Sequence, residues 1–267
     1  MTTTDSTDRF GAIPAAAVIS VCLEAQASVP ARSGIARVLG RSPLSADSRP
    51  WYLGAIGGLQ VAERLAKLGP EWTVLHSVPI GERGSDIDHV VIGAAGVFTI
   101  NTKFHEDARI WVGSKGLLVN GQKTDHLRNS RYEAQRVARQ LAAVAGTPID
   151  VHAVIVLVGA RSITIREQPS DVVVLRDIVL VRWLARRQAT LDADLRDRLA
   201  AAMTRRQTWA TTSEATSEPD VPAFTALRRQ VAVARRLRLL WATTALVGVV
   251  AVAATCAVNA YAALLGG

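Results

Sequence analysis

Apolar residues recur along the chain at two different spacings, and these spacings separate helices from strands. Over residues 51–68 they recur every three or four positions, the spacing of one helix face, until Gly69-Pro70 ends the pattern. Asn129 or Ser130 is a suitable cap for a second helix that runs to Ala145. Two further helices are predicted at residues 177–187 and 191–206.

Short apolar runs bounded by turn residues predict strands. They lie at residues 72–78, 87–92, 97–103, 109–112, 117–119, 151–158 and 172–175. The run at 151–158 is apolar on both faces, which is typical of a central strand covered on both sides. This order of strands and helices favours an α/β fold, with a mixed central sheet flanked by helices.

The C-terminal region changes character twice. Residues 208–224 are polar and acidic and contain proline, which predicts a flexible linker. Residues 239–258 carry no charge, and as a helix these 20 residues would span about 30 Å, the thickness of a bilayer core. A buried core helix is the alternative, but the run is long and apolar all round. The pattern therefore predicts a transmembrane helix over residues 239–265 that has the lipid bilayer as its partner.

Arginines precede this apolar run, at positions 228, 229, 235, 236 and 238. Positive charge beside a membrane span favours the cytoplasmic side. We therefore expect a single-pass, tail-anchored protein of the cell membrane, with its globular domain in the cytoplasm. The expected divisions are a globular domain at 51–207, a polar linker and basic juxtamembrane segment at 208–238, and the span.

Residues 1–50 are expected to form a flexible arm and linker. An apolar run at 12–23 resembles the core of a signal peptide, but the preceding residues include Asp5, Asp8 and only Arg9, so the usual positive region is missing. A short helix on a loose arm is the favoured interpretation. Residues 32–50 are rich in Ser, Pro, Arg and Gly and are predicted to be linker.

Net charge and cysteine content exclude few classes of function. The net charge is +8 overall and +5 over residues 51–207, which is compatible with a polyanion partner but is not diagnostic. Cys22 and Cys256 lie far apart and form no C-x-x-C pattern, so neither a disulfide framework nor a thiolate zinc site is implied. No small-molecule cofactor motif is evident either.

The stretch from Ser85 to Lys103 is where we look first for chemistry. It predicts a hairpin of two strands, and side chains alternate faces along each strand. Asp88 lies on one strand, while Asn101 and Lys103 share a face of the next. A buried sheet tolerates charged groups only when they are paired or used. The alternative for Asp88 is an edge carboxylate that pairs with Arg83 or His89.

The same stretch resembles the nuclease-related domain (NERD), a branch of the PD-(D/E)XK nuclease superfamily. The resemblance covers roughly residues 51–183 and rests on SDIDHVVIG, GVFTINTK, LLVNGQ and LRNSRYEAQR, which occur in that order. The spelling NTK is similar to the actinobacterial members. The resemblance implies a mixed sheet flanked by helices and magnesium-dependent cleavage of phosphodiesters. It also implies that Asp88 and Asn101 are metal ligands, and that both act in catalysis together with Lys103.

Two positions depart from the family pattern. Asn101 stands where an acidic residue is usual, and an amide oxygen brings no charge to a Mg²⁺ ion. Gly58 stands where the family has a glutamate on the first helix, and Glu63 lies about 140° around that helix. Glu133 is a possible substitute, but its favoured role is a charge at a helix end. The sequence thus predicts a weak Mg²⁺ site.

Nucleic acid is the expected partner. Arg128 and Arg131 flank a predicted helix start and could hold a phosphate there, or could be solvated surface residues. The leading hypothesis is a membrane-anchored, nuclease-like domain with weakened catalysis. The alternative is a non-catalytic nucleic-acid-binding or scaffold module on the cytoplasmic membrane face, and a third is a domain that only mediates assembly.

Overall fold

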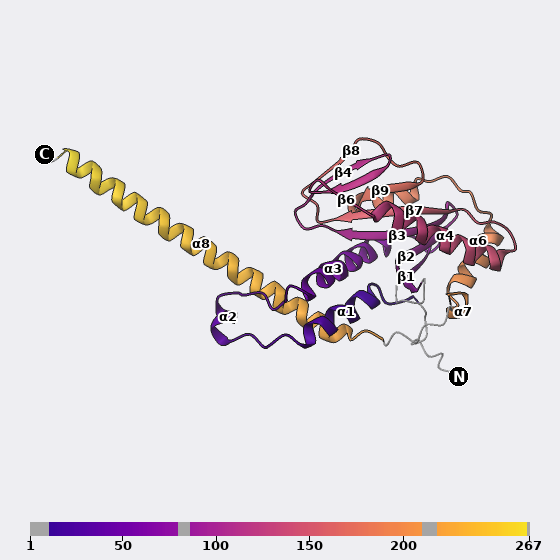
Figure 1. Cartoon of the computed structure of the whole chain (residues 1–267), viewed down its shortest axis with the longest axis horizontal. Helices are drawn as coiled ribbons and strands as arrows, with labels where there is room; N and C mark the ends of the chain where they lie inside the picture. The colour runs from indigo at the N-terminus through magenta and orange to yellow at the C-terminus, as the bar shows by residue number, and fades with distance from the viewer. Residues whose placement is uncertain (1–10, 80–85, 210–217, 266–267) are drawn as a thin grey trace. The chain divides into compact units, whose positions relative to one another are not determined.

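The computed structural model describes residues 11–79, 86–209 and 218–265 (Figure 1). The chain divides into two compact units. The first comprises Met1–Cys22 and Pro50–Pro219, and the second comprises Leu23–Arg49 and Asp220–Gly267. We describe the two units separately.

A five-stranded sheet forms the centre of the first unit. Its strands are β1 (Thr73–Pro79), β2 (Asp86–Gly93), β3 (Gly96–Phe104), β7 (Val151–Val158) and β9 (Val172–Arg176), in the order β1-β2-β3-β7-β9. The first three strands are antiparallel, whereas β7 and β9 run parallel to β3. The predicted α/β fold with a mixed sheet is therefore confirmed, and β7 lies between two neighbours as its apolar sequence indicates.

Helices cover both faces of this sheet. Helices α3 (Ser48–Leu65) and α5 (Leu180–Ala185) contribute Val61, Leu65, Leu180 and Leu184 to a core that contains Phe98 and Ile100 of β3. Helices α4 (His126–Ala145) and α6 (Ala193–Met203) contribute Val137, Leu141, Leu199 and Met203 to a second core, which contains Val90, Ile92 and Val97. Since strand residues alternate faces, position 88 of β2 and positions 101 and 103 of β3 belong to the face that α4 covers.

A second, four-stranded sheet lies beside the first within this unit. It contains β4 (Arg109–Gly113), β5 (Gly116–Val119), β6 (Gln122–Thr124) and β8 (Ser162–Ile165), in the order β6-β5-β4-β8. The strands β4 and β5 are predicted by their sequences. The strands β6 and β8 are not predicted, because they are only three and four residues long and largely exposed, although Ser162–Ile165 does alternate polar and apolar residues.

The helices on the C-terminal side differ from the predictions at their ends. Helix α4 begins at His126, about one turn before the predicted start, with Asp125 at the N-cap position but without a capping hydrogen bond from its side chain. The predicted helix over 177–187 is a 3-10 turn, η1 (Asp177–Val179), followed by α5. The one over 191–206 is α6, capped by Asp192, and the short helix α7 (Arg206–Trp209).

The N-terminal region is more ordered than its composition suggests. Helix α1 (Ala16–Ala27) has Ile19 and Cys22 buried, and the Ala16 N–H donates a hydrogen bond of 2.8 Å to Ser77 Oγ of β1. Residues 11–22 thus pack against the rest of the first unit and do not form a loose arm. Apolar residues that are evenly spread around α1 give no sequence signal for this packing.

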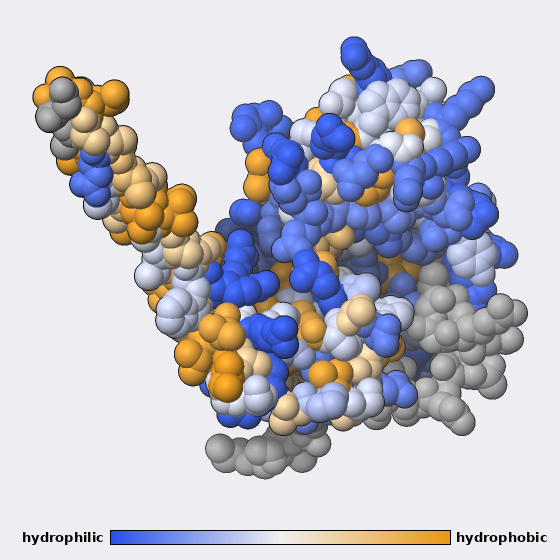
Figure 2. Space-filling model, turned by 60° about the vertical axis from the view of Figure 1, so that its left-hand side comes forward, coloured by the Kyte–Doolittle hydropathy of each residue, from blue (hydrophilic) through white to orange (hydrophobic). Residues whose placement is uncertain are grey.

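The second unit is dominated by α8 (Val221–Leu265), a helix of 45 residues, and also contains α2 (Gly34–Val38). The helix is continuous from Val221 through the arginine cluster into the apolar run, so the basic segment is helical. Among the described residues, α8 is the one helix that is long and apolar enough to cross a membrane. Figure 2 shows the hydrophobic surface of its C-terminal part, which suggests a membrane anchor.

A tight turn fixes the hairpin of β2 and β3. Gly93 pairs with Gly96, and a Cβ atom at position 93 would lie 2.4 Å from the ring of Trp72. Glycine is therefore required there, because Trp72 packs directly over the turn and also contacts Phe98.

We predict that Gly93→Ala lowers the free energy of unfolding by about 1–3 kcal/mol, because the Trp72 ring must move. Gly116→Ala is the control, since its Cβ would meet only Leu118 Cδ1 at 3.9 Å. The control should stay within about 0.5 kcal/mol of the wild type. Urea unfolding of the full chain in detergent, followed by tryptophan fluorescence, measures both. Equal effects of the two variants would show that Trp72 does not constrain the turn.

Candidate functional site

Asp88 occupies the place where β2 and β3 stop pairing. The register between these strands ends at His89 and Ile100, and beyond it Asp88 Oδ2 accepts a hydrogen bond of 2.5 Å from the Thr102 backbone N–H. Of the two alternative partners, His89 is engaged elsewhere, since its Nδ1 lies 2.8 Å from His76 Nδ1, and Arg83 is outside the described residues. The carboxylate of Asp88 thus bridges two strands at the open end of the hairpin.

Asn101 is joined to α4 through Glu133. Asn101 Nδ2 donates a hydrogen bond of 2.5 Å to Glu133 Oε1, and the two residues are 4% and 8% exposed. The interpretation of Glu133 as a helix-end charge is therefore wrong. Because α4 begins at His126, Glu133 lies in the second turn, within the buried stripe of the helix rather than at its exposed end.

Asp86 is a site residue that the sequence reasoning missed. It lies two positions before Asp88 on the same face of β2, and burial raises its pKa to about 7, with the charge of Asp88 adding to the effect. The signal was present in the sequence, since the motif SDID places two carboxylates at the spacing of one strand face.

Burial and mutual repulsion raise the pKa values of the carboxyl groups. The pKa of Glu133 is raised to about 7: burial is the largest cause and the charges of Asp88 and Asp86 add to it, whereas the Asn101 hydrogen bond and Lys103 oppose it. Burial likewise raises the pKa of Asp88, against the effects of Lys103 and the Thr102 N–H. Three carboxyl groups and one ammonium therefore share a largely buried region. Such a region favours bound protons or a bound cation.

Unsatisfied oxygen atoms indicate which cation fits. Asp86 Oδ2, Asn101 Oδ1 and Glu133 Oε2 are buried without a hydrogen-bond partner in the described part of the chain. Carboxylate and amide oxygens are hard ligands, which Mg²⁺ prefers. Across residues 11–79, 86–209 and 218–265, however, no group of three or more His, Cys, Asp or Glu side chains is arranged to hold one metal ion. A Mg²⁺ ion here would keep several water ligands.

Lys103 lies near a pair of histidines at the start of α4. His105 Nε2 and His126 Nε2 are 3.2 Å apart, and burial, followed by the charge of Lys103, lowers the pKa of both imidazoles. For His126 the pKa falls to about 4. His126 is therefore uncharged at neutral pH. His105, in the loop after β3, contacts the first residue of α4.

The two arginines proposed for nucleic acid have other partners. Arg128 is exposed and pairs with Asp125 at 3.0 Å. Arg131 forms two hydrogen bonds with Asp171, of 2.6 and 2.9 Å, and this contact raises the pKa of the guanidinium. Since α4 begins at His126, these arginines lie in its first and second turns rather than flanking its start.

Gly58 cannot be replaced by the glutamate of the family pattern without rearrangement. A Cβ atom at position 58 would lie 3.2 Å from Ala15 Cβ, so this side of α3 packs against the N-terminal segment. Its neighbour Gly57 packs against Thr102 and Phe104 of β3. Glu63 is exposed and offers no substitute. The extra acidic residue beside Asn101 therefore comes from α4, through Glu133, and not from α3.

A mixed sheet covered by helices, with Asp88 on one strand and an Asn-x-Lys sequence on the next, is consistent with a nuclease-like α/β domain. Residues 53–158 match the family model described as Nuclease-related domain (NERD). This part of the chain is therefore similar to the NERD family, and the matched residues include Asp88, Asn101, Lys103 and Glu133. No curated protein and no solved structure matches the chain.

The pKa of Glu133 predicts a pH-dependent difference between the wild type and Glu133→Gln. The folded-state pKa of about 7 lies above the ordinary value of 4.5, so the neutral side chain favours folding below pH 4.5. This contribution is lost as the pH rises through about 7. In the absence of divalent metal, the melting temperature of the wild type should fall relative to the variant between these two pH values, by on the order of 5 °C.

Glutamine keeps an oxygen for the Asn101 hydrogen bond, which isolates the effect of charge. Glu63→Gln on the exposed side of α3 is the matched control, and its profile should parallel that of the wild type. Parallel profiles for the wild type and Glu133→Gln would show that Glu133 ionises as freely in the folded chain as in the unfolded one.

Proposed function

We propose that this protein is a membrane-anchored, weak magnesium-dependent nuclease. The observation that carries this proposal is the buried contact between Asn101 and Glu133, because it returns a carboxylate to a site where the sequence has replaced one by an amide. Asp88, Asn101 Oδ1 and Glu133 would hold the ion, and Asp86 would add negative charge beside them. A bound Mg²⁺ would polarise the phosphate and lower the pKa of a bound water.

The residues around the proposed metal site would have separate roles in the reaction. Lys103 stabilises negative charge that develops on the phosphate, or positions the attacking water, from the end of β3. Thr102 holds Asp88 through its backbone N–H, so the metal-binding carboxylate keeps its orientation. His126, the first residue of α4, contacts His105 and feels the charge of Lys103, and the free N–H groups at such a helix start would favour an anionic phosphate.

Nucleic acid is the substrate class that this charge distribution favours. The net charge over residues 51–207 is +5, so binding should be weak, independent of sequence and strongly reduced by salt. Arg128 and Arg131 would contribute at the periphery after exchanging Asp125 and Asp171 for phosphate groups. Their present ion pairs reduce the positive charge that they offer.

The membrane arrangement is part of the same proposal. Helix α8 anchors the protein, and the arginines before its uncharged run favour the cytoplasmic side for the first unit. A nuclease-related domain held there acts on nucleic acid close to the cytoplasmic membrane face.

We predict slow, Mg²⁺-dependent cleavage by the full chain at low salt. Lys103→Ala should reduce the rate by roughly tenfold or more, because the substitution removes the cation beside the reacting phosphate. Glu133→Gln should raise the Mg²⁺ concentration needed for half-maximal cleavage by a similar factor. Lys123→Ala, on the exposed strand β6, removes the same charge elsewhere and should leave the rate unchanged.

The outcomes separate the candidate functions. Binding of nucleic acid without cleavage at any Mg²⁺ concentration would favour the non-catalytic module, for which the closed packing at Gly58 is the supporting observation. Absence of binding at low salt would favour a domain that only mediates assembly. Cleavage that survives Lys103→Ala would place the reaction elsewhere in the chain.

A further inference from the structure

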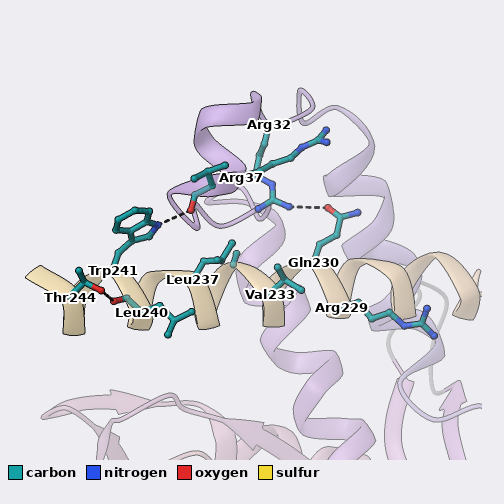
Figure 3. Close-up of a pocket in the computed structure, with 11 residues that line it drawn as sticks. Arg32, Arg37, Arg229, Gln230, Val233, Leu237, Leu240, Trp241 and Thr244 are labelled. Carbon is teal, nitrogen blue, oxygen red and sulfur yellow. Dashed lines mark hydrogen bonds between the residues drawn. The ribbon is translucent and has the colours of Figure 1, made fainter.

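The second unit contains an open groove between its N-terminal segment and α8 (Figure 3). Its volume of about 630 Å³ is within the range of small-molecule sites. Arg32, Arg37 and Val38 line one side. Helix α8 lines the other through one turn after another, with Arg229, Gln230, Val233, Ala234, Leu237, Leu240, Trp241 and Thr244.

One end of the groove is apolar. Val233, Leu240 and Trp241 are 53%, 62% and 49% exposed, and Leu237 lies between them on the same helix face. Trp241 is held in place, since its Nε1 donates a hydrogen bond of 2.8 Å to the Val38 carbonyl oxygen. Gly40 allows the two segments to approach, because a Cβ atom there would lie 2.6 Å from the Ala234 carbonyl oxygen.

The other end is positively charged. Arg32 donates hydrogen bonds to the Arg41 carbonyl oxygen at 2.7 Å and to Gln230 Oε1 at 3.3 Å, so its guanidinium is positioned without being neutralised. Within the described parts of the chain, Arg32, Arg37 and Arg229 form no ion pair with a carboxylate. The second unit as a whole has nine arginines, no lysine and only three acidic residues.

The groove also straddles a change in the character of α8. Charged residues end at Arg238, and the uncharged run begins at Leu239, within the length of the groove. A ligand that fits must therefore carry negative charge at one end and a hydrocarbon chain at the other. Guanidinium groups bind the oxygens of a phosphate through two parallel hydrogen bonds, and tryptophan favours the boundary between headgroups and hydrocarbon.

We propose that this groove binds one anionic phospholipid, with its phosphate at Arg32 and Arg37, positive charge added by Arg229, and one acyl chain along Leu237, Leu240 and Trp241. The proposal rests on α8 acting as the membrane anchor. It goes beyond attraction of a basic segment to an anionic membrane, because it assigns the lipid to particular arginines and not to others on the same helix.

The test compares two triple variants of equal charge. The full chain is reconstituted into phosphatidylcholine bilayers, and the association of spin-labelled phosphatidylglycerol is measured relative to spin-labelled phosphatidylcholine. The wild type should prefer phosphatidylglycerol, and R32Q/R37Q/R229Q should lose that preference by roughly fivefold or more. The control R228Q/R235Q/R236Q removes the same charge from exposed positions outside the groove, and should change the preference by less than about twofold.

Two further experiments test the apolar end of the groove and distinguish binding of a lipid from binding of free phosphate. Leu237→Trp fills the groove without changing charge, and should also reduce the preference. Soluble glycerol phosphate lacks an acyl chain and should not compete with the spin-labelled lipid. Competition by glycerol phosphate would refute the assignment of a lipid to the groove. If the chain floats with the vesicles but does not prefer phosphatidylglycerol, the lipid site in the groove is refuted while the membrane anchor stands. The same holds if both triple variants lose the preference for phosphatidylglycerol equally. A chain that does not float with the vesicles would overturn the anchor and the groove together.

Discussion

The candidate site depends on the burial of carboxyl groups on the sheet face that α4 covers. Glu133 and Asn101 meet there at 2.5 Å, among apolar residues that would otherwise exclude charge. Burial raises the pKa values of Glu133 and Asp86 to about 7, which means that the protein maintains a destabilising arrangement near neutral pH. A cation that binds the unsatisfied oxygens would relieve this cost, whereas an apolar replacement would remove it.

The hairpin of β2 and β3 makes this arrangement possible. Trp72 packs over its turn at Gly93. At the opposite end the strands separate, and Asp88 accepts a hydrogen bond from the Thr102 backbone N–H. The separation leaves room for side chains of β3 to meet α4. The same strand end carries Lys103 toward His105 and His126, so the cation and the carboxylates converge although they come from three elements.

The sequence predicts the central sheet well because buried strands such as β7 consist of continuous runs of apolar residues. It also locates Asp88, Asn101 and Lys103 by alternation along the hairpin. It does not predict the role of Glu133, which depends on where α4 starts and how it crosses β3. Nor does it show that Gly58 packs against Ala15, because that contact joins segments 43 residues apart whose own patterns are uninformative. The strands β6 and β8 are missed because they are short and largely exposed.

If the cluster around Asn101 and Glu133 holds Mg²⁺ as proposed, it releases protons when the ion binds. Calorimetric titration of the full chain with Mg²⁺ at pH 7, in two buffers of different ionisation enthalpy, tests it most directly. Groups with pKa values of about 7 are partly protonated at that pH, so binding should release protons, and the observed heat should differ between the buffers. Binding with the same heat in both buffers, or no binding at millimolar Mg²⁺, would contradict the account.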